Sequence, residues 1–389
     1  MFADAYFPTL DGTVTFLDGL ARNLKAQGHR PVLIVPSERV RRNRLIEHDV
    51  MEVGSLRAPF APPGYRMTWE SARGVTSRLR DLQFDLVHIH SPFTAAHLGV
   101  EFAARRRLPT VLTYHTLFPA YAALYGPRWG SRLWERVVTR RSRRVGNRCD
   151  LVIANSAPMV PVLRSYGITA PIHMIPVGIN HEVFSRARRA GVVRDRFGIA
   201  QDSKILLYVG RIGAEKSVDL LVPMLKDVRR RHNAHLVLCG HGAQVEAIKR
   251  MAADHSLSPW VHFAGVIREP AELARYYGDA DAFVFPSRTD TFGAVVVEAQ
   301  AAGLPVVAVG VLGSTATVED GVSGLLASHD AQDLSRQVCR LLSDPHLASS
   351  LRASGRRRAR HFSANEIAAR YVDSYEELLR RGVDAAAAR

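Results

Sequence analysis

The sequence predicts an α/β protein built from two doubly wound domains. Short apolar runs alternate with amphipathic helical patterns from end to end of the chain. Each run is apolar at consecutive positions and is followed by turn residues, which is typical of parallel strands covered on both faces by helices. A chain of 389 residues is also too long for one ordinary core. We therefore expect two similar domains with a ligand cleft between the carboxyl ends of their sheets.

Both halves of the chain hold expected strands. The first half holds "PVLIVP" (31–36), "DLVHIH" (85–90), "TVLTYH" (110–115) and "DLVIAN" (150–155). The second half holds "KILLYVG", "HLVLCG", "WVHFAG", "DAFVFPS" and "LPVVAV". Helical stretches separate these runs in both halves, so each half reads as one domain.

The domain boundary is expected near "IPVGINHEVF" (175–184), where a Pro/Gly turn leads into an Arg-rich stretch. We predict an N-terminal domain over 1–178 and a C-terminal domain over 179–362. Residues 363–389 are predicted to form a helix that crosses back toward the first domain and ends in a frayed tail.

Composition restricts the class of protein. Hydrophobic residues make up 47% and charged residues 23%, as in ordinary globular proteins, and no apolar run approaches the roughly 20 residues that a membrane span needs. The N-terminus carries no basic leader, and the three cysteines show no metal spacing, so we expect a reduced, cytoplasmic setting. The net charge of +15 favours an anionic partner: a nucleic acid, an acidic lipid surface or a phosphorylated ligand.

Two carboxylates flank a predicted helix start in "PSRTDTFGAVVVEAQAAGLPVV" (286–307). Asp290 follows a strand, and Glu298 lies on the next helix. The N–H groups of the turn Thr291, Phe292 and Gly293 would suit an anion or a sugar hydroxyl, and Glu298 could hold a diol. The alternative is that Asp290 caps the helix and Glu298 is merely solvated.

Cations follow another strand in "YVGRIGAEKS" (208–217). Arg211 and Lys216 around a helix start would suit a diphosphate, although both could also be ordinary surface residues. The segment is not a P-loop, because Glu215 stands where glycine is required. Gly12, at the entry to a helix near residue 13, is a second phosphate-facing turn.

Two further patterns carry candidate side chains. His115 ends the strand in "TYHTLFPAY" and is a catalytic candidate, with His90 a weaker one; a structural role is the alternative for both. Asp279 and Asp281 form a D-x-D pattern, but their place between a helix and a strand predicts a turn, so we expect no metal.

The segment 131–148 is strongly basic. Arg132, Arg136, Arg140, Arg144 and Arg148 recur every four residues and would form a ridge on a helix, with Leu133, Trp134, Val137 and Val138 facing away from it. Such a helix can bind an anionic membrane surface, or it can be a solvated helix whose apolar side packs on its own domain.

Taken together, these motifs resemble the retaining GT-B glycosyltransferases, in the large family of α-glucosyl and α-mannosyl transferases. The resemblance spans nearly the whole chain, from "DAYFPTLDGTVT" through "VGRIGAEKS" and the segment 286–307 to "EDGVSGLL". It implies two Rossmann-like domains that face a central cleft. "YHTLFPAY" and "TDTFG" look most like the glycolipid branch, which glycosylates diacylglycerol or related lipids at the cytoplasmic membrane face.

The resemblance also implies roles for the matching positions. Arg211 and Lys216 would neutralise the leaving diphosphate, so that neither a metal nor another cofactor is needed. Glu298 would bind the ribose, while Asp290 and the backbone of 291–293 would hold the transferred sugar. Gly12 would lie beside the diphosphate and His115 beside the sugar. The reaction would retain configuration by front-face attack.

Two departures from the family pattern stand out. Asp290 replaces the more usual glutamate, which shortens the side chain by one methylene. The central strand that usually precedes "FADAYFP" is reduced here to Phe2 and Ala3, which would expose two sheet edges; a start codon upstream would explain this.

The favoured hypothesis is hexose transfer to a membrane lipid such as diacylglycerol, with UDP-glucose as the first choice of donor and GDP-mannose as the second. The main alternative is the same chemistry on a soluble acceptor. A nucleic-acid-binding protein would explain the charge, but neither aromatic residues among arginines on a strand surface nor a helix-turn-helix unit is apparent. A nucleotide-sugar epimerase would explain the fold but not the cations and acids.

Overall fold

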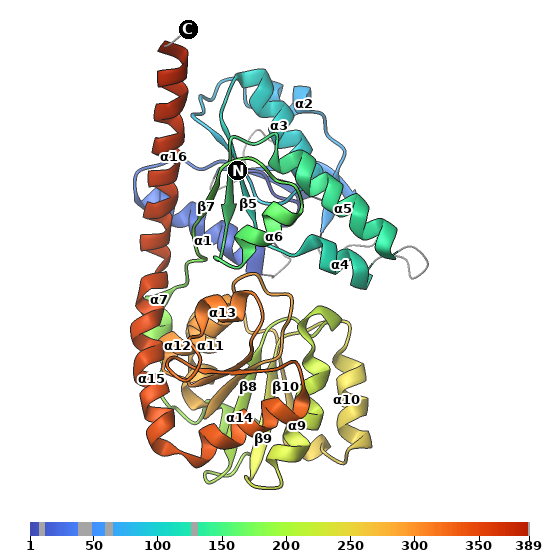
Figure 1. Cartoon of the computed structure of the whole chain (residues 1–389), viewed down its shortest axis with the longest axis vertical. Helices are drawn as coiled ribbons and strands as arrows, with labels where there is room; N and C mark the ends of the chain where they lie inside the picture. The colour runs from blue at the N-terminus through green and yellow to red at the C-terminus, as the bar shows by residue number, and fades with distance from the viewer. Residues whose placement is uncertain (8–11, 38–48, 59–64, 126–130, 388–389) are drawn as a thin grey trace. The chain divides into compact units, whose positions relative to one another are not determined.

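The structure is a computed structural model, and it describes residues 1–7, 12–37, 49–58, 65–125 and 131–387. The chain forms two compact units (Figure 1). Unit 1 comprises residues 1–178 and 365–389, and unit 2 comprises residues 179–364. Each unit has a sheet of its own, and the two are described separately below.

The strands of unit 1 run in the spatial order β3-β2-β1 and β4-β5-β6-β7. All pair in parallel except β2 with β3, which are antiparallel. Their bounds are β1 Leu33–Ser37, β2 Val50–Arg57, β3 Arg66–Thr68, β4 Val87–Ile89, β5 Thr110–Tyr114, β6 Leu151–Ala154 and β7 Ile172–Met174.

The N-terminal residues join these two groups of strands. Phe2 forms parallel bridges with Ile34 of β1 and with Ile89 of β4. The Phe2 amide donates to His88 O at 2.8 Å, and the Ile34 amide donates to Met1 O at 2.8 Å. The expectation that a shortened first strand leaves two open edges is therefore wrong where Phe2 bridges β1 and β4, because residues 1–3 fill the gap between these strands.

The helices of unit 1 cover both faces of its sheet. They are α1 Gly12–Ala26, α2 Ala72–Arg78, α3 Thr94–Arg106, α4 Phe118–Tyr125, α5 Ser131–Gly146, α6 Met159–Ser165 and α16 Ala364–Ala387. The C-terminal helix α16 packs on this sheet through Ile367 and Tyr371, which share a core cluster with Phe16 of α1, Val111 of β5 and Ile153 of β6. Burial of these apolar side chains is what holds the last helix against strands more than 200 positions earlier in the chain.

Unit 2 contains a single parallel sheet in the order β10-β9-β8-β11-β12-β13. The chain therefore starts in the middle, moves to one edge, returns and moves to the other edge. The strand order reverses between β8 and β11, and open α/β sheets bind ligands at such a switch point. The bounds are β8 Lys204–Val209, β9 Ala234–Cys239, β10 Val261–Gly265, β11 Ala282–Phe285, β12 Val306–Val309 and β13 Leu325–Ala327.

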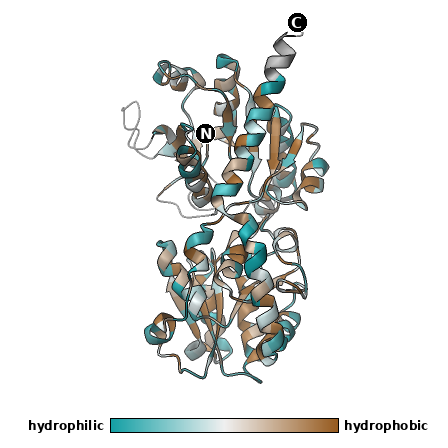
Figure 2. Cartoon of the chain, turned by 90° about the vertical axis from the view of Figure 1, so that its left-hand side faces the viewer, coloured by the Kyte–Doolittle hydropathy of each residue, from teal (hydrophilic) through white to brown (hydrophobic). Residues whose placement is uncertain are grey.

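The helices of unit 2 flank this sheet (Figure 1). They are α7 His181–Ser185, α8 Val192–Phe197, α9 Leu221–Val228, α10 Val245–Asp254, α11 Pro270–Asp279, α12 Ala294–Ala302, α13 Gly313–Thr317, α14 Ala331–Ser343 and α15 Pro345–Ala359. Single 3₁₀ turns lie at Ala214–Lys216, Val218–Leu220, Ser258–Trp260 and Arg360–Phe362. The central strands of both units are hydrophobic, and many of the helices carry hydrophilic residues (Figure 2).

All nine apolar runs singled out in the sequence contain a strand. The pattern missed β2, β3, β7 and β13. The strands β3, β7 and β13 have three residues each, and the burial of β2 changes from mostly buried to exposed at its end, so neither gives a clear apolar run. The strands β3, β7 and β13 lie at sheet edges, where less burial is required, whereas β2 lies between β1 and β3.

Candidate active site

Lys216 and Asp290 form the central polar contact of unit 2. Lys216 closes the 3₁₀ turn after β8, and Asp290 follows β11, the neighbouring strand across the switch point. The Lys216 Nζ lies 2.8 Å from both carboxylate oxygens of Asp290. The two side chains are 14% and 20% exposed, so the ion pair is mostly screened from water but still accessible. Two residues that are 74 positions apart therefore meet where a doubly wound sheet binds its ligand.

A second cation is held beside this pair. Arg211 Nε lies 3.6 Å from Glu215 Oε1, and the Glu215 side chain is fully buried. A Cβ at Gly213 would lie 2.4 Å from the Glu215 carboxylate, so only glycine fits there. Thr289, which precedes Asp290, donates from its hydroxyl to Glu215 O at 2.8 Å. The loop after β8 and the loop after β11 are thus bonded to each other.

The turn at 290–293 has the geometry of an open helix start. Gly293, at φ 81°, is the N-cap of α12, and no side chain caps this helix. The hypothesis that Asp290 is the cap is therefore wrong. The Gly313 amide donates to Asp290 O at 2.9 Å and supports the turn from behind. Thr291 and Phe292 are buried, so a ligand would meet this turn through its backbone.

Glu298 lies one and a half turns into α12 and is partly buried. The hydroxyl of Tyr277, on α11, donates to Glu298 Oε2 at 2.9 Å. Burial raises the pKa of Glu298 to about 7, although the hydrogen bond from Tyr277 acts in the opposite direction. The carboxyl group thus changes charge near neutral pH, and the hypothesis of a merely solvated residue is wrong.

In unit 1, His115 directly follows β5 and His90 directly follows β4. His90 Nδ1 and His115 Nε2 are 3.1 Å apart, within hydrogen-bonding distance. The ring of Phe16 packs on His115 with 4.8 Å between centroids. Phe16 lies about one turn into α1, whose first residue is Gly12. A Cβ at Gly12 would meet nothing within 4 Å, so the fold itself does not require glycine at that position.

Burial keeps the three clustered histidines His88, His90 and His115 neutral. Burial lowers the pKa of His115 to about 3 and lowers that of His90 well below its usual value. The pKa of His88, whose ring centroid lies 4.0 Å from that of His90, is lowered for the same reason. This cluster can offer hydrogen bonds but carries no charge at neutral pH.

The arginines of the basic helix are exposed. Arg132, Arg136, Arg140 and Arg144 of α5 are exposed, whereas Val138, Ser142 and Val145 face the core. Arg148 is exposed too, but it lies two residues beyond the end of α5, so the prediction that it belongs to the helical ridge is wrong. Leu133 and Val137 were expected to face away from the ridge. That prediction is wrong: they are 61% and 41% exposed and lie on the same outer face as Arg140 and Arg144.

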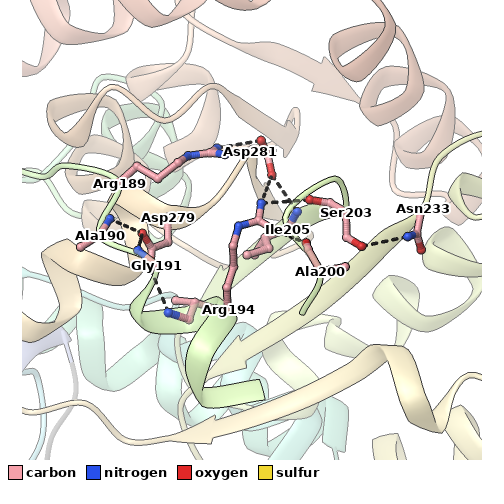
Figure 3. A network of polar contacts seen from close by, with 11 residues as sticks. Arg189, Ala190, Gly191, Arg194, Ala200, Ser203, Ile205, Asn233, Asp279 and Asp281 are labelled. Carbon is pink, nitrogen blue, oxygen red and sulfur yellow. Dashed lines mark hydrogen bonds and ion pairs between the residues drawn. The ribbon is translucent and has the colours of Figure 1, made fainter. Parts of the chain in front are cut away.

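The D-x-D acids of unit 2 are part of the scaffold (Figure 3). Asp279 accepts hydrogen bonds from the amides of Ala190, Gly191 and Val193 at 2.6 to 2.8 Å. Asp281 pairs with Arg189 at 2.8 Å and accepts from the Ile205 amide at 2.9 Å. Both acids thus tie the segment around α8 to the sheet. Across the part of the chain that the structure describes, no group of three His, Cys, Asp or Glu residues is placed to hold a metal ion.

Sequence reasoning missed the partners of these residues. It assigned no role to Tyr277, and it used Glu215 only to exclude a P-loop. Tyr277 lies 21 positions before Glu298 on a different helix, and only the packing of α11 beside α12 brings them together. The sequence signal for Glu215 was an acid two residues after a glycine; its burial is seen only in the structure.

The chain matches known families and structures. Residues 10–183 match the family described as "Glycosyltransferase Family 4", and residues 192–358 match "Glycosyl transferases group 1". An alpha-monoglucosyldiacylglycerol synthase of Acholeplasma laidlawii is 26% identical, over 90% of this chain and 89% of that protein. A D-inositol 3-phosphate glycosyltransferase of Frankia alni is 33% identical, over 76% of this chain and 75% of that protein.

Two solved structures share the fold. Sucrose-phosphate synthase of Thermosynechococcus elongatus superposes with a TM-score of 0.79 at 23% identity, over 97% of this chain and 96% of that one. Anabaena HepE, solved in complex with UDP-glucose, has a TM-score of 0.74 at 19% identity, over 96% of this chain and all of that one.

Fold and site together define a nucleotide-sugar-dependent glycosyltransferase with the GT-B fold. The chain belongs to glycosyltransferase family 4, a retaining family.

Proposed function

We propose that this enzyme transfers a hexose from a nucleotide-diphosphate sugar, with UDP-glucose favoured, to a membrane lipid such as diacylglycerol. The observation that carries the donor half is the Lys216–Asp290 pair at the switch point of unit 2. A cation there suits a diphosphate, and an acid beside it suits sugar hydroxyls. Among the relatives, one is a synthase of a glucosyl lipid and a neighbouring fold holds UDP-glucose.

The step proposed is a front-face substitution. The bond between the anomeric carbon and the phosphate oxygen breaks, the acceptor oxygen bonds to the same face of that carbon, and the departing phosphate oxygen takes the acceptor proton. Lys216 and Arg211 stabilise the negative charge that develops on the diphosphate, so the step is proposed to need no metal. This set of cations would act without reorganisation, because Glu215 and Asp290 already hold them.

The remaining roles concern binding. Asp290 and the backbone of Thr291, Phe292 and Gly293 hold hydroxyls of the transferred sugar, and Glu298 holds the ribose. In unit 1, His115 contacts the sugar and Gly12 lies beside the diphosphate. The open space around Gly12 supports its place beside the diphosphate, because the fold does not require glycine there. The uncapped start of α12 supports the binding of sugar hydroxyls by the backbone of residues 291–293.

The lipid half rests on the outer face of α5. Exposed apolar side chains among arginines are typical of helices that lie in a membrane interface, where the apolar groups enter the lipid and the cations meet its phosphates. Leu133 and Val137 stand on the same face as Arg140 and Arg144. None of the described helices is long and apolar enough to cross a bilayer. We therefore propose peripheral attachment to the inner face of the cell membrane.

A vesicle-binding experiment tests the lipid half. The triple variant Arg136→Gln, Arg140→Gln, Arg144→Gln should bind anionic phosphatidylglycerol vesicles on the order of 100-fold more weakly than the wild type, since each Arg near such a surface contributes roughly 1 kcal/mol. The matched control removes three exposed arginines of unit 2, Arg250, Arg275 and Arg340, and should bind as the wild type does. Wild-type binding should also weaken with salt. Equal binding by both triple variants would refute the assignment of α5.

A donor and acceptor screen separates the two remaining hypotheses. Transfer from UDP- and GDP-hexoses is measured with and without membrane lipid extract. Lipid-dependent turnover of UDP-glucose supports the proposal, and GDP-mannose turnover would replace the donor. Efficient transfer to a soluble acceptor, unaffected by the α5 substitutions, would favour the soluble alternative. Family membership favours sugar transfer, to either kind of acceptor, over nucleic-acid binding or epimerisation.

A further inference from the structure

His90 is a fully buried polar group next to the proposed unit 1 site. Its side chain is fully inaccessible, while His115 reaches the surface in part. The two imidazole rings stack with 5.4 Å between centroids and 17° between planes. The single short contact between their nitrogens joins His90 Nδ1 to His115 Nε2 at 3.1 Å. His90 therefore contacts the catalytic candidate His115. Because His90 itself is buried, it can affect a substrate only by positioning His115.

The other nitrogen of His90 decides which ring donates this hydrogen bond. No described residue makes a hydrogen bond to His90 Nε2, although the atom is buried. The nearest ring, His88, has both nitrogens engaged: Nδ1 with Tyr375 Oη at 2.7 Å and Nε2 with Thr113 Oγ1 at 2.7 Å. If His115 donated, His90 would keep its proton on Nε2 and bury an N–H group without an acceptor. Such orphaned donors are rarer in proteins than orphaned acceptors.

We infer that His90 donates from Nδ1 to His115 Nε2 and so fixes His115 as the Nδ1–H tautomer. The tautomer follows from the geometry alone, whereas its consequence for the sugar rests on the proposed function. In that tautomer the lone pair on His115 Nε2 accepts the hydrogen bond from His90, and the ring proton of His115 is on Nδ1. It serves the transferred sugar as a hydrogen-bond donor and cannot act as a general base. The lowered pKa values of both rings mean only that each ring is neutral and carries a single proton; the Nε2 of His90, unpartnered among the described residues, decides its position.

The tautomer can be read without any activity. The protein is labelled with ¹⁵N-histidine, and the ring nitrogens are correlated with the ring protons by long-range NMR; the His115 signals are those lost in His115→Gln. The wild type should show a protonated Nδ1 and a bare Nε2 on His115. The reverse pattern would overturn the inference directly, with no need for a variant at position 90.

Two variants of His90 test the positioning role. His90→Asn places an amide N–H near the position of Nδ1 and should keep the Nδ1–H tautomer of His115. His90→Asp offers only an acceptor and should move the proton of His115 to Nε2. The kcat/KM for transfer should then fall about tenfold further in His90→Asp than in His90→Asn, as expected when one buried hydrogen bond is lost.

The outcomes are distinct. Inversion of the tautomer with an equal loss of kcat/KM in both variants would overturn the role of His90 in the reaction while leaving the transferase activity intact. If no donor is turned over by the wild type, the proposed function fails, and the NMR experiment still decides the tautomer. Circular dichroism melts of both variants establish that the compared proteins are folded.

Discussion

The two units handle electrostatics in opposite ways. In unit 2 the proposed donor site is charged, with Lys216 bound to Asp290 and Arg211 held by buried Glu215. In unit 1 the candidate residue His115 lies in a cluster of neutral, buried imidazoles. The difference fits a division of labour in which one unit stabilises a departing diphosphate and the other supplies an uncharged hydrogen bond. Under the proposed function, unit 2 would place charge where the reaction develops it.

The largest expected effect comes from removing the cation of unit 2. Lys216→Ala should lower kcat by about 100- to 1000-fold, because one preorganised electrostatic contact to the leaving group is lost and Asp290 is left unpaired. Steady-state kinetics with the preferred donor measure this. Lys226→Ala, at an exposed position on α9, is the matched control. A nearly normal rate for Lys216→Ala would remove the proposed role of the pair.

A smaller effect is expected at Glu298, where the pKa of about 7 makes donor binding depend on pH. Below that pKa the carboxyl is mostly protonated and accepts hydrogen bonds from ribose hydroxyls more weakly. The KM for the donor should therefore fall about tenfold as pH rises from about 6 to 8. Glu298→Gln should raise KM and abolish this pH dependence.

The same residue gives a stability test with a defined sign. The folded-state pKa of Glu298 lies above its ordinary value of 4.5, so the folded protein holds this proton more tightly than the unfolded chain. Its contribution to the free energy of unfolding is present below pH 4.5 and is lost as pH rises to about 7. Denaturant melts give the free energy of unfolding at each pH, and between about pH 4.5 and 7 it should fall more steeply with pH in the wild type than in Glu298→Gln. Equal pH dependence in the two proteins would contradict the raised pKa.

An effect no larger than that at Glu298 is expected in unit 1. His115→Ala should lower kcat/KM by about tenfold through the loss of one hydrogen bond. Because the pKa of His115 is about 3, the ring stays neutral over the working range, and the variant should keep the shape of the wild-type pH profile between about pH 5 and 9. Loss of a limb of the profile in His115→Ala would show that this histidine titrates during turnover, which would undo the contrast between the units.

The sequence predicted the architecture well because strands and helix starts are local features. Apolar runs marked the central strands, and Gly293 marked the start of α12. The candidates Asp290, Lys216 and Arg211 were found because all follow strand ends, where parallel sheets place their ligands. Short or half-exposed strands such as β3 gave no such pattern.

What the sequence could not predict is which side chains meet. The face of α5 shows this most clearly: the arginine ridge was evident, but Leu133 and Val137 were assigned to the wrong side. Helical spacing fixes the angle between two side chains but not the direction of the core. That direction depends on how α5 packs, which turns Val138, Ser142 and Val145 inward.

By itself the sequence determined two doubly wound domains and the turns after β8 and β11, together with the candidate residues in those turns. The domains and turns follow from periodicity and from backbone preferences over a few neighbouring residues. The tertiary structure alone decided that Lys216 bonds Asp290, that Tyr277 bonds Glu298 and that His90 bonds His115. These pairs are 74, 21 and 25 positions apart. Their contacts exist because burial of the strands between the helices fixes distant chain segments side by side.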